Sequence, residues 1–172
     1  MAAIVWTLVC SVLAAAVELI VGSYGICLPA FAAVAFCLAV AQGGRRAFPA
    51  LAISGAILDL SFTRGFPAQL VLLPLLAALA EIWRKHGDCA NPFAQLLPGV
   101  AVGGLSGAVL VVFVCLPGTP FGWDLLWRNG WIVLQSVIGG AVLTPFAMVL
   151  LDGGGRRLGL PLYAKARNRQ EE

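Results

Sequence analysis

The sequence predicts an all-α integral membrane protein with six transmembrane helices, and three observations lead to that prediction. Of its 172 residues, 60% are hydrophobic and only 11% are charged, and the mean hydropathy is +0.94, far from the balance of a soluble domain. Apolar runs close to the roughly 17 to 25 residues that a helix needs to cross a bilayer core recur along the chain. These runs lack the period-2 alternation of barrel strands, so helices are expected rather than a barrel.

Short polar or glycine-rich turns separate the apolar runs and set the predicted bounds of the spans. No basic residue precedes the first run, which argues against a cleaved signal peptide. In the second run Pro29 falls in the first turn, where a proline is tolerated. The predicted spans cover residues 2–22, 26–42, 47–63, 67–84, 96–116 and 131–151 in one domain, 1–151, and residues 152–172 are expected to form a basic cytoplasmic tail.

The third and fourth spans are predicted to form a helical hairpin that carries a buried acid. Gly65 and Pro67 lie in a turn that is too short for anything but a tight reversal, so the two helices should lie side by side. Asp59 precedes that turn, and an acid at mid-membrane costs about 2.5 to 3.5 kcal/mol, less towards an interface. The carboxylate should face the free N–H groups that begin the next helix, with Arg64 close enough to help. Asp59 either ties the two helices together, which we favour, or forms a proton or ligand site.

The other polar residues of the predicted spans contain no catalytic pattern. The chain has no G-x-S-x-G, H-E-x-x-H or P-loop sequence. Its five cysteines form no C-x-x-C pair, and its single histidine, His86, follows Lys85 in a loop. Glu18 should lie at roughly the depth of Asp59, and its role is open. We therefore expect no enzymatic activity, no metal site and no cofactor.

A stripe of small residues follows one face of the fifth span. Gly99, Gly103 and Gly107 recur at four-residue spacing. In lipid, where apolar burial gives little drive between helices, such a stripe permits close helix contact. We favour packing inside the chain over a partner surface, although the pattern does not identify whose helix packs there, and an oligomer is possible.

Three tryptophans recur every four residues before and at the start of the sixth span. On a short helix, Trp123, Trp127 and Trp131 would form one aromatic face at the level of the lipid headgroups. We favour a lipid anchor, and a docking surface for a partner outside the membrane is the alternative. Pro145 should kink the sixth span, which is expected to pack inside the bundle.

Basic residues set the predicted orientation. With both termini in the cytoplasm, nine basic residues fall on the inside and two, Arg64 and Arg128, on the outside. Since they lie at span ends, they indicate orientation rather than nucleic-acid binding, and the basic tail should be attracted to anionic lipid. The nine inside residues are Arg45, Arg46, Arg84, Lys85, Arg156, Arg157, Lys165, Arg167 and Arg169.

Two stretches resemble the family of the bacterial rod shape-determining protein MreD. Residues 55–60, Gly-Ala-Ile-Leu-Asp-Leu, resemble the Gly-x-x-x-Asp-Leu motif of that family. Residues 143–152 and 156–159 look like the end of the same family. The chain differs in the turn after Asp59, which reads Gly-Phe-Pro-Ala at 65–68 instead of the Pro-hydrophobic-Gly that is usual there.

This resemblance implies a non-enzymatic scaffold of the cell-elongation machinery for rod shape and peptidoglycan synthesis. Such a protein lies in the bacterial inner membrane and binds the membrane-anchored protein MreC, with other members of the elongation complex as further expected partners. Its fold is similar to that of the substrate-binding subunits of energy-coupling-factor vitamin transporters. A vitamin-binding transporter subunit is therefore the alternative, but it needs an outward-opening polar pocket. The spans offer few polar groups besides Glu18, Asp59 and Gln69, which favours the scaffold.

Overall fold

The chain is all-helical in the computed structural model, which describes residues 2–62, 66–88, 91, 93–115, 123–160 and 163 and has no strand among them. Three stretches are long and apolar enough to cross a membrane, namely Ala2–Gly22, Phe93–Phe113 and Trp127–Arg157. They mark the protein as membrane-embedded. The helices are α1 (Ala2–Gly22), α2 (Ala30–Gln42), α3 (Gly44–Ser61), α4 (Ala68–His86), the 3-10 turn η1 (Phe93–Gln95), α5 (Leu96–Leu110), the π-helical turn η2 (Val111–Cys115) and α6 (Trp123–Arg157).

Helices α3 and α4 are long enough for a bilayer but carry more charge than the three apolar stretches. With 18 and 19 residues, each is about 27 to 29 Å long, close to the thickness of a bilayer core. Each contains three charged residues, at its basic end and, in α3, at Asp59. The charged residues are Arg45, Arg46 and Asp59 in α3 and Glu81, Arg84 and Lys85 in α4.

Helix α2 is shorter than the predicted second span and begins four residues later. Residues 26–29 are not helical, and α2 has 13 residues, about 20 Å of helix. The reason is Pro29, which disfavours a helical conformation at the residue before it and forms the N-cap of α2. Irregular backbone is tolerated at membrane depth where it is buried in protein. Here the backbone N–H of Cys27 donates to Gln135 Oε1 of α6 at 3.2 Å.

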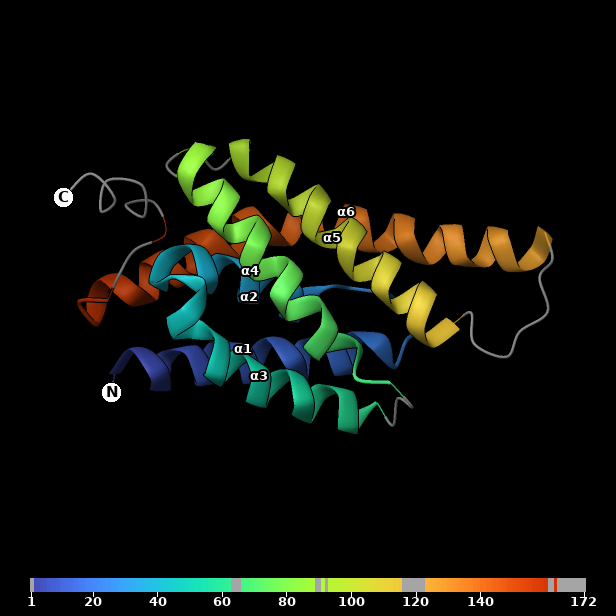
Figure 1. The fold of residues 1–172 in the computed structure, drawn as a ribbon, viewed down its shortest axis with the longest axis horizontal. Helices are drawn as coiled ribbons and strands as arrows, with labels where there is room; N and C mark the ends of the chain where they lie inside the picture. Colours follow the sequence, from blue (N-terminus) through green and yellow to red (C-terminus); the bar gives the residue numbers. More distant parts are fainter. Residues whose placement is uncertain are drawn as a thin grey trace.

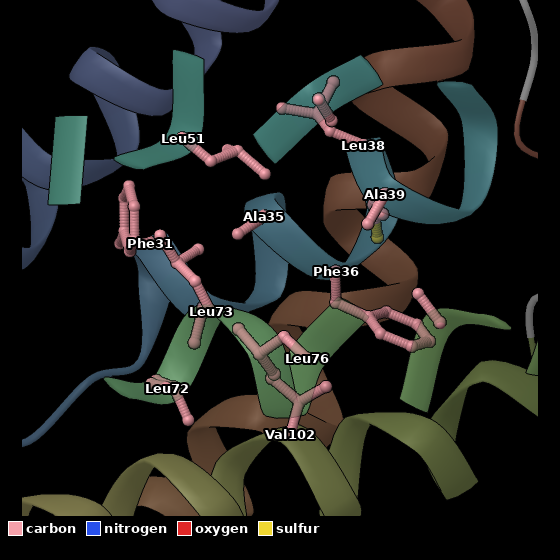
Figure 2. Close-up of a cluster of buried hydrophobic side chains, with 14 of the residues drawn as sticks. Phe31, Ala35, Phe36, Leu38, Ala39, Leu51, Leu72, Leu73, Leu76 and Val102 are labelled. Carbon is pink, nitrogen blue, oxygen red and sulfur yellow. The ribbon is translucent and has the colours of Figure 1, made fainter. Parts of the chain in front are cut away.

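Short as it is, α2 is the centre of the fold. It contacts each of the other five α-helices, and ten of its 13 residues are buried, as expected of a helix that is apolar all round. Figure 2 shows Phe31 and Phe36 on opposite sides of α2, with Leu51 of α3, Leu72 and Leu76 of α4 and Val102 of α5 around them.

The predicted glycine stripe lies against α6 of the same chain. A Cβ on Gly99 would come within 2.6 Å of the carbonyl oxygen of Gly140, and one on Gly107 within 3.0 Å of the Cα of Val133. A Cβ on Gly103 would collide with the carbonyl oxygen of Ser136. The two backbones are thus in direct contact, and any larger side chain at these positions would push α5 and α6 apart.

Helix α6 is one continuous helix of 35 residues, so the prediction of a separate short tryptophan helix is wrong. Helix propagation adds one hydrogen bond per residue, and this outweighs the roughly 1 kcal/mol cost of Gly130 in a helix interior. Pro145 lies within the helix. Its length is about 52 Å, and Figure 1 shows its N-terminal end projecting beyond the rest of the bundle.

Part of the predicted tail belongs to the helical bundle. The start of α1 and the end of α6 lie at the same end of the bundle (Figure 1). Helix α6 continues to Arg157, and Tyr163 is fully buried among core residues. The first six residues of the predicted tail therefore belong to α6, and the ring of Tyr163 packs 6.5 Å from that of Phe36. Residues 161–162 and 164–172 of the predicted tail lie outside the described residues.

Candidate functional site

Two acids meet around one glutamine at the end of the bundle where α1 and α3 end and α4 begins. The backbone N–H of Gln69 donates to Asp59 Oδ2 at 2.9 Å and Oδ1 at 3.2 Å. Its side-chain Nε2 donates to Glu18 Oε1 at 3.1 Å, and Glu18 Oε2 accepts the backbone N–H of Phe31 at 3.0 Å. Glu18, Asp59 and Gln69 are all buried. One cluster therefore joins α1, α2, α3 and α4.

Asp59 contacts the first turn of α4, as the sequence suggested. The N-cap of α4 is Pro67, which supplies no side-chain cap. Gln69 is the second residue of α4, and its N–H is one of the groups that a helix leaves without an internal partner. The carboxylate of Asp59 accepts that N–H from the neighbouring helix and lies where the helix dipole favours an anion.

Gly55, one turn before Asp59, lies where α3 contacts α2 and α4. A Cβ at Gly55 would lie 3.4 Å from both the Cβ of Gln69 and the Cζ of Phe31, at the edge of ordinary van der Waals contact. Asp59 follows one turn later on the same face and reaches the start of α4. In the Gly-x-x-x-Asp spacing the acid thus has a clear structural use in this chain, whereas the contacts of the glycine alone do not require it.

Glu18 caps the start of α2 in the same way, a role that was not predicted from the sequence. Helix α2 also has a proline N-cap without a side-chain cap, and Phe31 is its second residue. Glu18 accepts that N–H from α1. An acid near the end of one helix, followed by a proline that opens the next, occurs in both hairpins, and this repeated pattern could have revealed the role of Glu18.

A cavity of about 230 Å³ lies beside this cluster. Its walls come from α1, residues 25–29, the start of α4, α5 and α6, and Phe62 also lines it. Most lining residues are apolar. The polar side chains among them are Glu18, Gln69, Ser106 and Ser136. Gln69 Oε1 is buried, and no hydrogen-bond partner for it lies among the described residues.

The predicted tryptophan face lies apart from the acids, on the projecting end of α6. The exposed fractions are 87% for Trp123, 81% for Trp127 and 54% for Trp131. Arg64, which was expected beside Asp59, lies outside the described residues. In the part of the chain that the structure describes, no group of three or more His, Cys, Asp or Glu side chains could hold a metal ion.

A second polar cluster, at the opposite end of the bundle, was not predicted. The backbone N–H of Tyr163 donates to Asp152 Oδ1 at 2.6 Å, and its hydroxyl donates to Gln95 Oε1. Gln95 Nε2 in turn donates to the carbonyl oxygen of Asp88 at 2.8 Å. No local pattern predicts contacts between residues so far apart in the sequence, although a lone tyrosine and a glutamine with apolar neighbours are compatible with burial.

These observations define a membrane-embedded, all-helical protein. Its acids Glu18 and Asp59 connect helices, and its longest helix, α6, carries exposed tryptophans at its projecting end. No protein-family model, curated protein or solved structure matches the chain.

Proposed function

We propose that this chain is an MreD-like, non-enzymatic membrane scaffold of the bacterial cell-elongation machinery. It crosses the inner membrane six times with both termini in the cytoplasm and binds a membrane-anchored, MreC-like partner at its outer face. The observation that carries the proposal is the projecting end of α6 with its exposed tryptophans.

The length of α6 supports a docking role for its first turns. About 20 residues of helix span a bilayer core, and α6 has 35. Trp123 and Trp127 therefore lie beyond the hydrocarbon, if the apolar part of α6 is centred in the bilayer. Exposed tryptophan is the residue type most often found as an interface anchor, and the close backbone contact of α5 with α6 gives this end a rigid base.

The motif that resembles the MreD family also has a clear structural use here. Gly55 lies where α3 contacts α2 and α4, and Asp59 caps α4. Both roles maintain architecture and leave no reacting group exposed, which fits a scaffold better than an enzyme.

A vitamin-binding transporter subunit is the second candidate, and the cavity beside Glu18 and Gln69 favours it. The cavity is more polar than the sequence led us to expect, because Ser106 and Ser136 join the two buried side chains. Its volume is small for a vitamin site, since ligand pockets for drug-sized molecules usually measure about 300 to 1,000 Å³.

Replacement of Trp123 and Trp127 by alanine tests the scaffold. Both side chains are exposed, so the double variant should insert and purify like the native protein, yet recover much less of the partner from native membrane and fail to restore rod shape in depleted cells. Phe93→Ala is the matched control, because Phe93 is as exposed as Trp127, at 81%, and lies in η1, just before α5. Full complementation by the double variant would confine these tryptophans to lipid anchoring.

A further inference from the structure

A second cavity, which we call the α1–α6 groove, lies between these two helices and shares no lining residue with the cavity beside Glu18. It measures about 300 Å³, and none of its described lining residues is charged. Ala30 and Ala33 of α2 form its floor, where their small side chains leave the space unfilled. Leu13 of α1 and Phe146 of α6 line its sides and are exposed. Since α1 and α6 are both long and apolar enough to cross a membrane, the groove opens to the lipid.

The length of the α1–α6 groove corresponds to one leaflet of a bilayer. On α1 the groove extends from Trp6 to Val17, about 17 Å of helix, and on α6 from Leu143 to Leu151, about 12 Å. Half of a bilayer core is about 15 Å thick, whereas a partner helix that crosses the membrane would need a groove of about 30 Å. The groove therefore fits an acyl chain of one leaflet better than a second transmembrane helix.

The α1–α6 groove ends near the C-terminal end of α6, which is basic. Trp6 of α1 packs against α6 there, since a Cβ on Gly154 would collide with its indole ring. Leu150, Gly154 and Arg157 follow one another at spacings of four and three residues, so Arg157 continues the face of α6 that lines the groove. Tryptophan partitions to the headgroup level of a bilayer, and arginine matches the geometry of a phosphate. This end of the groove is therefore suited to a lipid headgroup.

The charges at this end favour a headgroup that is anionic. Arg156 and Arg157 are both exposed, and neither forms an ion pair among the described residues. The first turn of α1, at the same end of the bundle (Figure 1), contains no acid. The nearest acid along α6, Asp152, is buried and accepts the backbone N–H of Tyr163. The two arginines would thus complement a phosphate whose charge is not balanced by a cation in the same headgroup.

We propose that the α1–α6 groove binds one anionic phospholipid. One acyl chain lies over Ala30 and Ala33 between α1 and α6, and the phosphate group binds Arg156 and Arg157. Hydrocarbon surrounds every helix in a membrane, so the apolar groove alone does not distinguish one lipid from another, and the arginines supply the selectivity. The site goes beyond the proposed scaffold and does not depend on it.

Native mass spectrometry of the full chain in detergent tests the proposal, with phosphatidylglycerol and phosphatidylcholine of the same acyl chains as probes. We expect one retained phosphatidylglycerol and little phosphatidylcholine. Arg156→Gln with Arg157→Gln should weaken phosphatidylglycerol binding roughly tenfold or more, since each basic residue near a membrane surface contributes about a factor of five. Arg45→Gln with Arg46→Gln is the matched control, because this exposed pair lies at the start of α3, which does not line the groove. The control should leave binding unchanged.

Val34→Phe tests the acyl part of the site without a change of charge. Val34 of α2 lines the groove and is half-buried, so the larger ring should occupy the space of the acyl chain and abolish retention of the lipid. Val12→Phe is the control for this variant, since Val12 is exposed on α1 and does not line the groove.

Four outcomes would overturn the proposal. They are equal retention of the two lipids, no retention of either, equal losses from the two arginine pairs, and retention that Val34→Phe leaves unchanged. A dimer that Val34→Phe dissociates would also overturn it, because the groove would then be an interface between two copies of the chain. Partner recovery by the tryptophan variants is a separate measurement, so this proposal and the scaffold can fail independently.

Discussion

In each of the two N-terminal hairpins, α1 with α2 and α3 with α4, an acid caps the second helix. The two acids differ in which helices they contact. In each, an acid near the end of the first helix accepts the N–H of the second residue of the next helix, whose N-cap is a proline. Asp59 accepts from the second helix of its own hairpin. Glu18 also accepts from the side chain of Gln69 in the other hairpin.

This difference assigns Glu18 the larger structural role. Among the described residues, hydrogen bonds to Glu18 connect the central helix α2 with α4, whereas both oxygens of Asp59 accept from one backbone N–H of α4. In a membrane, apolar burial contributes little to the association of helices, so such polar contacts help to determine which helices pack together. The comparison predicts that losses at the two acids are unequal.

The largest effect is expected for Glu18→Leu. The variant leaves the N–H of Phe31 and the amide of Gln69 without this partner, and we expect a loss of about 2 to 4 kcal/mol in the free energy of unfolding. Titration of the purified protein with denaturing detergent measures that loss. Glu18→Gln should be milder, because a glutamine keeps an acceptor for Phe31 and the amide of Gln69 can turn to offer its Oε1. Equal losses in the two variants would contradict the hydrogen-bonding role.

A smaller effect is expected for Asp59. Asp59→Leu should destabilise the protein more than Asp59→Asn, since asparagine keeps an acceptor for the N–H of Gln69. The difference should be on the order of 1 kcal/mol, measured in the same titration. If the loss for Asp59→Leu exceeded that for Glu18→Leu, the ranking of the two hairpins would be wrong. Equal stability of the two Asp59 variants would mean that the carboxylate does not cap α4.

The sequence predicted one hairpin well and the other poorly, because the start of α2 was misplaced. Asp59 precedes the Gly65 and Pro67 turn, so it was expected to face the start of α4. After α1, by contrast, the second span was expected to begin at residue 26, whereas Pro29 is the N-cap of α2 and the helix begins at Ala30. With that start misplaced, Phe31 was not recognised as the second residue of the next helix, and Glu18 was left without a role.

The same distinction between local and distant contacts explains the other outcomes. The spacing of Gly99, Gly103 and Gly107 is a local pattern, and it predicted a close helix contact, although not that the partner is α6. The fold of Tyr163 onto Gln95 depends on residues far apart in the chain, so no window of sequence could show it. In α6 the four-residue tryptophan period correctly indicated a helix, but that helix is continuous with the sixth span and not a short helix before it.

The smallest predicted effect concerns the contact that joins the first helices of the two hairpins. Ser11 Oγ of α1 and Ser54 Oγ of α3 lie 2.7 Å apart and are buried. Each hydroxyl also has a carbonyl of its own helix within reach, Leu8 for Ser11 and Ala50 for Ser54. Loss of one partner therefore leaves the other hydroxyl satisfied.

A double-mutant cycle with Ser11→Ala and Ser54→Ala measures this contact directly. The coupling energy should be about 0.6 kcal/mol, typical of side-chain hydrogen bonds between membrane helices. Thr7→Ala with Ser54→Ala is the matched control, because Thr7 bonds to Gln42 of α2 instead, and that pair should be additive. A coupling above about 2 kcal/mol would make α1 and α3 the principal link between the hairpins. Glu18 would then not be the principal link between the hairpins. We expect the serine pair to contribute less because Glu18 already joins the two hairpins through its contact with Gln69.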